Sequence, residues 1–363
     1  MKVTTRCLIC VAFLRAATAY ADSAAVTSME NAVPHATNGC NGALVYTPQP
    51  GTQFFPVTVN MPQGGEAFYA QAARRNVRWL ETMTCKPTQT HASISNSHAA
   101  TSYSSYSAVG NNWSGYQISN TAQYVQAGWF VPQVTLPSPG YADYNISKFE
   151  YDAAVWPGIG GGFGGTLPLI QSGTDSYIDI NGTDIYYFWW QIYDGTPRTF
   201  DGTEITDISV NPGDEVGAVS VWVPSYSYAT VGKAMLGVCN FTTGWCVHFN
   251  TDSVREPGNT TEWVVEAPSN WNGVLPLAKY GTAEMRNSCW AATTNLVVTP
   301  GGVVTSVGGG SGGAVDCKPI TAGRSVTSLD LQQRVLSSPQ VLSSPGPISF
   351  GGMGFNVYYH QPH

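Results

Sequence analysis

Short runs of apolar and β-branched residues, separated by Gly, Pro, Asn or Asp, fill the chain from about residue 112 onward. Within several of them apolar and polar positions alternate, which is the period of a β-strand with one buried face. The predicted strands are Tyr124–Leu136, Lys148–Trp156, Ser176–Ile180, Ile185–Tyr193, Glu204–Val210, Val216–Val223, Lys233–Asn240, Trp245–Asn250, Thr261–Glu266 and Gly302–Val307. Because no helical interval separates them, they predict an all-β fold, a two-sheet antiparallel β-sandwich of the jelly-roll type.

One stretch near the N-terminus follows a helical period instead. In Glu66–Met83 apolar residues gather on one side, while Arg74, Arg75 and Arg78 cluster on another. The following stretch, Pro87–Ala142, contains no Asp, Glu, Lys or Arg and begins rich in Ser and Thr. Such a composition is typical of a flexible, cleavable linker, so we place a domain boundary within it.

A boundary at residue 111 also divides the charge. Residues 1–111 carry seven Lys and Arg against four Asp and Glu, a net charge of +3, whereas residues 112–363 carry nine against nineteen, a net charge of −10. We interpret residues 22–111 as a partly helical pro-segment with its linker, and residues 112–363 as the β-sandwich domain. We expect the basic helix to cover the groove of the acidic domain near neutral pH. The alternative is an ordinary solvated helix on one continuous domain.

The N-terminus has the composition of a secretory signal. Lys2 and Arg6 precede the apolar run Cys7–Leu14, and a stretch of small residues ending at Ala21 provides a cleavage site. We therefore predict that residues 1–21 are a signal peptide and that the protein is secreted. A buried N-terminal strand is the alternative interpretation.

Removal of this signal leaves an even number of cysteines, as expected in an oxidising, extracellular compartment. The six are Cys40, Cys85, Cys239, Cys246, Cys289 and Cys317. Cys239 and Cys246 flank a hairpin-like stretch that would bring their sulfurs across a strand pair. The pairing of the other four stays open.

The composition excludes several classes of protein. Only 11% of the 363 residues are charged, and the chain has 39 Gly, 19 Tyr and 11 Trp, which disfavours coiled coils and solvated helical bundles. A formal net charge of −7 gives no basic surface for nucleic acid, so we expect no nucleic-acid partner. No run of 18 apolar residues follows residue 15, so we expect no membrane span. We expect a monomer without a cofactor.

Familiar catalytic motifs are missing from the sequence. It contains no HExxH, GxSxG or P-loop pattern and no Cys/His spacing suited to zinc, so no metal site is predicted. A Ser-His-Asp triad would depend on His248 or on the C-terminal histidines. Glu262 and Glu266 share a strand face, but four residues at about 3.3 Å place them roughly 13 Å apart, beyond the carboxylate separations of glycosidases. A cross-strand partner for either stays open.

Five segments carry a distinctive pattern in their order and spacing. They are Asn112–Tyr116, Trp156–Gly161, Leu169–Asp175, Tyr187–Tyr193 and Thr261–Glu266. Together they resemble the glutamic peptidases, or eqolisins, a family of secreted acid endopeptidases made as pre-pro-proteins. The resemblance covers roughly residues 112–290. It implies a zymogen that acts on protein or peptide substrates in a groove across one concave sheet.

The resemblance assigns the catalytic pair to Gln171 and Glu266. A carboxylate with an unperturbed pKa of about 4.3 can act as a general base toward water in mildly acidic solution, where a histidine would be protonated. The Gln amide stays neutral, and its NH2 can donate to the oxygen that becomes negative as a peptide carbonyl turns tetrahedral. This chemistry needs neither a metal nor a covalent intermediate.

Further residues of these segments are expected to bind substrate. The resemblance puts Trp113, Trp156 and Trp189 around the groove. It also implies that Asp175 holds neighbouring groups by hydrogen bonds. Gln191 shares a strand face with Trp189 and stands where the family commonly has a Glu, a difference that bears on pH optimum and substrate preference.

A binding protein is the competing interpretation. Concanavalin-like sandwiches also serve as carbohydrate-binding modules, and a groove lined by Trp and Tyr would stack on sugar rings. Such a module would be catalytically inactive. The presence of both Gln171 and Glu266 favours the endopeptidase.

Overall fold

The computed structural model describes most of the chain. The described residues are 33–36, 42–47, 58–88, 98–99, 106–137, 150–162, 165–194, 202–225, 230–270, 273–298, 304–306, 314–335 and 338–362. The predicted signal peptide, Cys40 and much of the predicted linker lie outside these residues.

The described part of the chain is mostly β-structure, as predicted. Up to residue 130 the strands are β1 (Val33–Ala36), β2 (Leu44–Thr47), β3 (Val59–Asn60), β4 (Arg78–Trp79), β5 (Cys85–Pro87), β6 (His98–Ala99), β7 (Tyr106–Gly110), β8 (Trp113–Ile118) and β9 (Tyr124–Phe130). From there to residue 266 they are β10 (Tyr151–Asp152), β11 (Ala154–Ile159), β12 (Leu169–Ile178), β13 (Asp184–Tyr193), β14 (Thr203–Ile205), β15 (Glu215–Pro224), β16 (Val231–Asn240), β17 (Trp245–Arg255) and β18 (Thr261–Glu266). All ten predicted strands overlap observed ones.

The C-terminal region adds strands that the sequence pattern did not predict, with β23 as the exception. They are β19 (Ser269–Asn270), β20 (Gly273–Val274), β21 (Thr282–Ala291), β22 (Leu296–Val298), β23 (Val304–Ser306), β24 (Val315–Asp316), β25 (Lys318–Pro319), β26 (Thr327–Val335), β27 (Ser338–Pro345) and β28 (Phe355–Tyr359). The helical elements are α1 (Phe68–Arg74) and two short 3-10 turns, η1 (Ile320–Ala322) and η2 (Phe350–Gly352).

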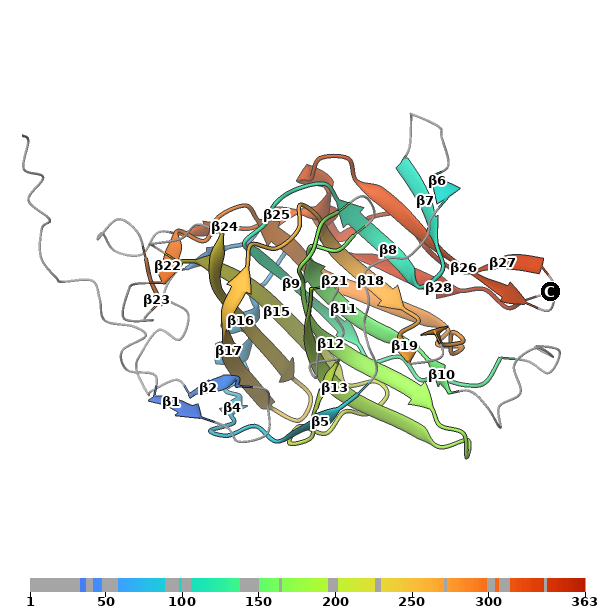
Figure 1. The fold of residues 1–363 in the computed structure, drawn as a ribbon, viewed down its shortest axis with the longest axis horizontal. Coiled ribbons are helices and arrows are strands. Elements are labelled where there is room, and N and C mark those ends of the chain that lie inside the picture. Colours follow the sequence, from blue (N-terminus) through green and yellow to red (C-terminus); the bar gives the residue numbers. More distant parts are fainter. Residues whose placement is uncertain are drawn as a thin grey trace, which may run out of the picture.

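Hydrogen bonds join 22 strands into one continuous, mainly antiparallel sheet with two arms (Figure 1). The first arm runs β5, β14, β13, β12, β11, β18, β8, β26, β7, β6. The second arm runs β1, β2, β17, β16, β15, β9, β21, β28. Strand β27 pairs with both β26 and β28 and so connects the arms. The two arms therefore belong to one hydrogen-bonded sheet. The arrangement as two separate sheets, expected for a sandwich, stays a prediction.

Alternation of side chains along the strands separates three apolar clusters. The largest contains residues from both arms, such as Val265 of β18 and Trp129 of β9. A second cluster lies on the other face of the second arm and includes Val219 of β15. The third lies on the other face of the first arm, where Val264 and Trp156 point. The residues expected to carry the chemistry belong to this third face.

The predicted helix Glu66–Met83 is wrong in length. Helix α1 covers only seven residues, and Asn76 follows it with a left-handed backbone (φ 50°). The chain then enters β4, which pairs with β17 through a hydrogen bond of 2.8 Å from the Arg78 N–H to the Gly244 carbonyl. Strand pairing with the sheet therefore overrides the helical period of the sequence.

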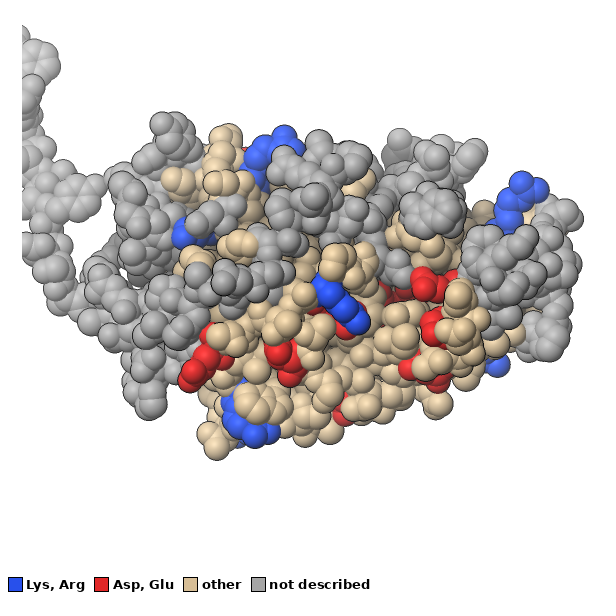
Figure 2. Space-filling view, turned by 60° about the horizontal axis from the view of Figure 1, so that its bottom comes forward, with Lys and Arg blue, Asp and Glu red and all other residues tan. Residues whose placement is uncertain are grey.

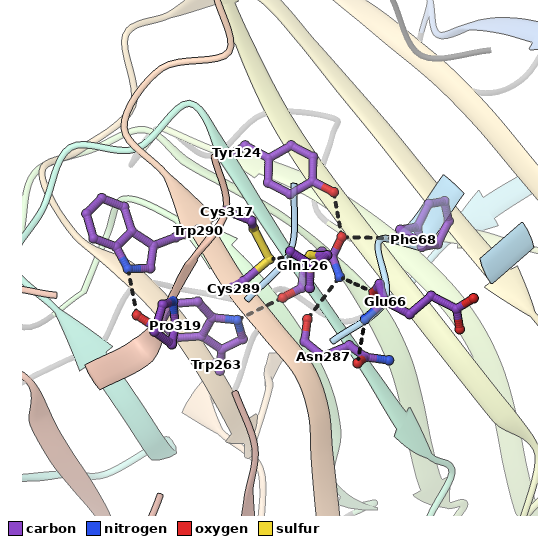
Figure 3. The surroundings of a disulfide bond; sticks show 11 residues. Glu66, Phe68, Tyr124, Gln126, Trp263, Asn287, Cys289, Trp290, Cys317 and Pro319 are labelled. Carbon is purple, nitrogen blue, oxygen red and sulfur yellow. Dashed lines mark hydrogen bonds between the residues drawn. A yellow bond between two sulfur atoms is a disulfide. The ribbon is translucent and has the colours of Figure 1, made fainter. Parts of the chain in front are cut away.

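Gln126 of β9 anchors α1 to the second arm (Figure 3). Its Oε1 accepts hydrogen bonds from the Phe68 N–H (2.9 Å) and the Tyr124 hydroxyl (2.5 Å). Its Nε2 donates to the carbonyls of Glu66 (3.0 Å) and Asn287 (2.9 Å). The helix was expected to cover the groove, and that expectation is wrong, because α1 packs on the second arm and the predicted site residues lie on the first.

Two disulfides lie within the described part of the chain. The predicted bond between Cys239 and Cys246 is confirmed and joins β16 to β17. Cys289 of β21 bonds Cys317, a pairing that the sequence left open. Cys85 is also disulfide-bonded.

Candidate active site

The predicted site residues lie on adjacent strands of the first arm, in the order β8, β18, β11, β12, β13. The pairings are antiparallel without a bulge, so side chains at paired positions point to the same face. On the face away from the largest core cluster they form three parallel rows across the strands. Neighbouring rows are two residues apart along each strand, or roughly 7 Å.

We name the rows by their side chains. The acidic row consists of Trp113, Glu266, Ala154, Asp175 and Tyr187. The tryptophan row consists of Gly115, Val264, Trp156, Gly173 and Trp189. The amide row consists of Gln117, Glu262, Gly158, Gln171 and Gln191. Gln171 and Glu266 thus share one face but lie on opposite sides of the tryptophan row, and Glu262 shares the row of Gln171.

Glu266 is a fully buried carboxyl with nitrogen donors around it. Its Oε2 accepts a hydrogen bond of 2.8 Å from the indole Nε1 of Trp156. The side chains of Trp113 and Asn112 also act on this carboxyl. Burial raises the pKa of Glu266 well above its ordinary value, the Trp156, Trp113 and Asn112 side chains oppose that rise, and the charge of Asp175 adds to it. A carboxylate in these surroundings is oriented and strongly basic.

Two glycines make room for the Trp156 indole. A Cβ atom on Gly173 would lie 2.5 Å from the Cβ of Trp156, and one on Gly158 would lie 2.6 Å from its ring atom Cζ3. Real Cβ atoms do not approach other carbons so closely. A side chain at Gly158 would therefore push the indole away from its hydrogen-bond partner, and one at Gly173 would collide with the backbone of Val155 and Trp156.

The three predicted groove tryptophans meet on this face. The ring centroids of Trp113 and Trp156 are 4.9 Å apart, and those of Trp156 and Trp189 are 6.3 Å apart, both in edge-to-face geometry. All three side chains are fully buried. In the structure they are part of a packed cluster, and their role in substrate binding stays a prediction.

Gln171 lies in β12, between Gly158 of β11 and Gln191 of β13. Its Nε2 donates to the Gln191 Oε1 at 3.3 Å, and both side chains are buried. Gln171 therefore occupies the middle of a strand within the sheet. Glu262, across Gly158, is fully buried as well, and burial raises its pKa well above the ordinary value.

Asp175 is held by two donors and one further carboxyl. Its Oδ1 accepts from the N–H of Ser176 (2.9 Å), and its Oδ2 accepts from the hydroxyl of Tyr187 (2.8 Å). The same Tyr187 hydroxyl is hydrogen-bonded to the Oγ1 of Thr88, which directly follows β5 in the predicted pro-segment. The side chain of Asp152 also acts on the pKa of Asp175. Sequence reasoning missed Asp152, although it precedes Ala154 by two residues and so shares its face.

His248, the residue on which a serine-type triad would depend, lies elsewhere. It is buried in β17 of the second arm, and its Nδ1 is 2.7 Å from the hydroxyl of Tyr69 in α1. Burial lowers the pKa of His248 to about 3. It is thus a neutral side chain against the N-terminal segment rather than a base on the candidate face.

The described residues contain no group of three His, Cys, Asp or Glu placed to hold a metal ion. Among them no helix is long and apolar enough to cross a membrane. Figure 2 shows Asp and Glu in separate groups on one face of the molecule, with Lys and Arg at isolated points. On that face the charges do not form one continuous basic surface.

Comparison with known proteins gives the family. Residues 111–326 match the model of the peptidase A4 family, more than half of the chain. The crystal structure of aspergilloglutamic peptidase from Aspergillus niger is similar with a TM-score of 0.37 and 20% identity, over 58% of this chain and 99% of that chain. No curated protein matches the sequence. The family match covers the strands that carry all three rows, and the chain therefore belongs to the peptidase A4 family, the glutamic peptidases.

Proposed function

We propose that the protein is a secreted acid endopeptidase in which Glu266 activates water and Gln171 stabilises the oxyanion. The observation that carries this proposal is the arrangement of Glu266. It is a fully buried carboxyl, held by the Trp156 indole, on the same sheet face as the Gln171 amide. Membership of the peptidase A4 family supports the reaction and implies protein substrates.

The proposed reaction uses only these two side chains and water. A substrate peptide lies over the tryptophan row, and Glu266 removes a proton from a water molecule as its oxygen attacks the scissile carbonyl carbon. The carbonyl oxygen becomes negative and accepts a hydrogen bond from the Gln171 NH2. Because the two residues lie two rows apart, roughly 13 Å along the strands, this step requires their side chains to converge over the tryptophan row when the site opens. The proton held by Glu266 then passes to the leaving nitrogen, the C–N bond breaks, and the carboxylate is restored. A raised pKa makes the ionised Glu266 a stronger proton acceptor but lowers its ionised fraction in acid, so the donors that oppose the rise are essential to this role.

We propose further that the full-length chain is an inactive zymogen. Gln171 and Glu266 are both 0% exposed in it, so a substrate cannot reach them without a rearrangement. The hydrogen bond of Thr88 to Tyr187, beside Asp175, supports a contact of residues 22–111 with the site. In this proposal residues 112–363 are the mature enzyme, and the two arms are the layers of the expected β-sandwich. A signal peptide in residues 1–21 agrees with the disulfides.

The experiment compares the purified full-length protein at neutral pH with the same protein after incubation in acid. Both are given a denatured protein substrate over a range of pH, with and without a metal chelator and serine- or cysteine-directed reagents. We expect hydrolysis only after acid treatment, with a maximum in acid and no effect of chelator or reagents. Loss of activity on chelation or a maximum at neutral pH would contradict the mechanism. Glycan binding without hydrolysis at any pH would favour the carbohydrate-binding alternative.

A further inference from the structure

Asp152 is a buried carboxyl that has no nitrogen or hydroxyl donor among the described residues. It ends β10 and is 0% exposed. Neither of its carboxyl oxygens accepts a hydrogen bond from an N–H or O–H group in the described part of the chain. An ionised carboxylate in such a place would be very costly, because nothing replaces the water that it loses on burial. The side chain therefore needs another way to satisfy its oxygens.

Asp175 is the partner that the sheet brings within reach. Asp152 pairs with Tyr177 across β10 and β12, which puts Asp175 at the adjacent diagonal position on the same face. At this diagonal spacing the two carboxyls come within hydrogen-bonding reach of each other, and each acts on the pKa of the other. Carboxylates only accept hydrogen bonds, so one of the two must carry a proton.

The surroundings decide which of the two is protonated. Asp175 accepts from the Ser176 N–H and the Tyr187 hydroxyl, two donors that favour its ionised form. Asp152 has no such donor in the described part of the chain, and burial raises its pKa well above the ordinary value. The proton therefore belongs to Asp152, whose O–H donates to Asp175.

The charge of this pair is close to the proposed base. Asp175 and Glu266 belong to the acidic row, with only the methyl group of Ala154 between them. Among the described residues, the charged groups that act on Asp152 are acidic, namely Asp175, Glu150 and Glu266.

Neighbouring strands add two tyrosines and one ion pair. Tyr177 and Tyr187 both keep their protons, since burial raises the pKa of each well above 10. Glu204 of β14 also faces Asp175, and Lys86 pairs with it at 3.0 Å. These neighbours bring no unpaired cation to the two carboxyls, and the pair with one proton carries a single negative charge.

We propose that Asp152 is a positioning residue of the peptidase: its protonated carboxyl donates to Asp175, fixes that side chain, and keeps the charge beside Glu266 at one unit. This role rests on the proposed function. When the proton leaves at higher pH, two buried carboxylates repel each other and Asp175 moves. The upper pH limit of activity is then set by Asp152.

The first measurement is infrared and needs no activity. Near neutral pH, ordinary carboxyls are ionised, so subtraction of the D152N spectrum from the wild-type spectrum should leave the carbonyl band of one protonated carboxylic acid. E150Q, which removes a neighbouring carboxyl, should leave that band in place. Titration of carbon-13 labelled aspartate carboxyls in the wild type gives the same answer if D152N does not fold. Absence of a protonated aspartate near neutral pH in these measurements would overturn the proposal.

The second measurement is the pH profile of kcat/KM. The side-chain amide that D152N introduces can donate to Asp175 but cannot ionise, so acid activity should stay near wild type. The upper pH limit should rise by at least about one unit, a tenfold change in proton affinity. D152A, without a donor, should lose activity throughout. If D152N has the wild-type profile, Asp152 has no positioning role even if it is protonated. If the wild type hydrolyses no peptide while the infrared band is present, the proposed function is wrong. The inference that Asp152 is protonated and donates to Asp175 is then still supported.

Discussion

The indole N–H of Trp156 donates to the Glu266 Oε2 over 2.8 Å, between residues 110 positions apart in the chain. The two side chains come from adjacent strands, β11 and β18, and each is fully buried. This hydrogen bond stabilises the ionised carboxylate, since it opposes the increase in pKa that burial causes. It therefore keeps part of the proposed base ionised in acid, where the enzyme is expected to work.

Replacement of Trp156 by Phe removes this donor and keeps most of the ring. The pKa of Glu266 should rise, so the acid limb of kcat/KM should move to higher pH. A hydrogen bond to a charged group contributes about 1.5–3 kcal/mol, so activity in acid should fall by roughly 10- to 100-fold. The pH dependence of kcat/KM measures both effects.

Trp263→Phe is the matched control for this prediction. Trp263 lies on the opposite face of β18, and its indole donates to the Gln126 carbonyl at 3.0 Å. The variant loses a buried hydrogen bond without touching Glu266, so stability should fall while the acid limb stays in place. Equal shifts of the acid limb in both variants would show that the Trp156 indole does not control the base.

Burial of His248 gives the protein a defined acid sensitivity. Its pKa of about 3 in the folded chain is below the ordinary value of about 6.5, so the folded state prefers the neutral ring. This contribution to stability is complete above pH ~6.5 and is lost as pH falls toward ~3, at about 1.4 kcal/mol per pH unit.

His248→Asn keeps an acceptor for the Tyr69 hydroxyl but does not titrate. Between pH 6.5 and 4 the wild type should therefore lose roughly 3 kcal/mol more of its free energy of unfolding than the variant. Urea unfolding at the two pH values measures the difference. Tyr69→Phe, which leaves the imidazole in place, should keep the steep dependence. Parallel losses in wild type and His248→Asn would rule out this histidine as the source.

Arg75 and Arg74 allow a controlled test of how residues 22–111 are held on the β-domain. Arg75 pairs with Glu215 of β15, whereas Arg74 pairs with Glu66 within its own segment. An ion pair of this kind contributes at most about 1 kcal/mol. Arg75→Gln should let the segment detach at a less acidic pH, as measured by limited proteolysis over a pH series, and Arg74→Gln should not. An unchanged threshold in Arg75→Gln would mean that this charge does not control release.

The strand pattern predicted the β-rich class of the fold and the face on which Glu266 lies, because both depend on a local two-residue period. The helix Glu66–Met83 failed since pairing of β4 with β17 is a tertiary interaction that no window of sequence contains. The rows of the site depend on register between strands far apart in the chain, which explains why Glu262 beside Gln171 was not foreseen. Asp152 belongs to no sequence motif, so its proposed role could not be predicted. That role depends on its diagonal position relative to Asp175 in the sheet.

The amide row allows a test of the oxyanion donor. Gln171→Glu replaces a neutral donor by a group that repels the developing negative charge when it is ionised. Loss of one oxyanion donor should reduce kcat by roughly 10²- to 10³-fold. Gln191→Glu is the control, since it adds the same charge beside the site while Gln171 keeps its amide. Near-wild-type turnover in a folded Gln171→Glu variant would remove Gln171 from the mechanism.

The central claim is that Glu266 is the general base, and Glu262 provides the sharpest comparison. Both are fully buried carboxyls on the same face of β18, four residues apart, and Glu262 lies in the row of Gln171. The measurement is kcat of Glu266→Gln and Glu262→Gln on one peptide at the wild-type pH optimum, after thermal unfolding shows that both are folded. We predict a loss on the order of 10²- to 10⁴-fold for Glu266→Gln and a far smaller loss for Glu262→Gln. Near-full activity of Glu266→Gln together with an inactive Glu262→Gln would contradict the account and assign the base to Glu262.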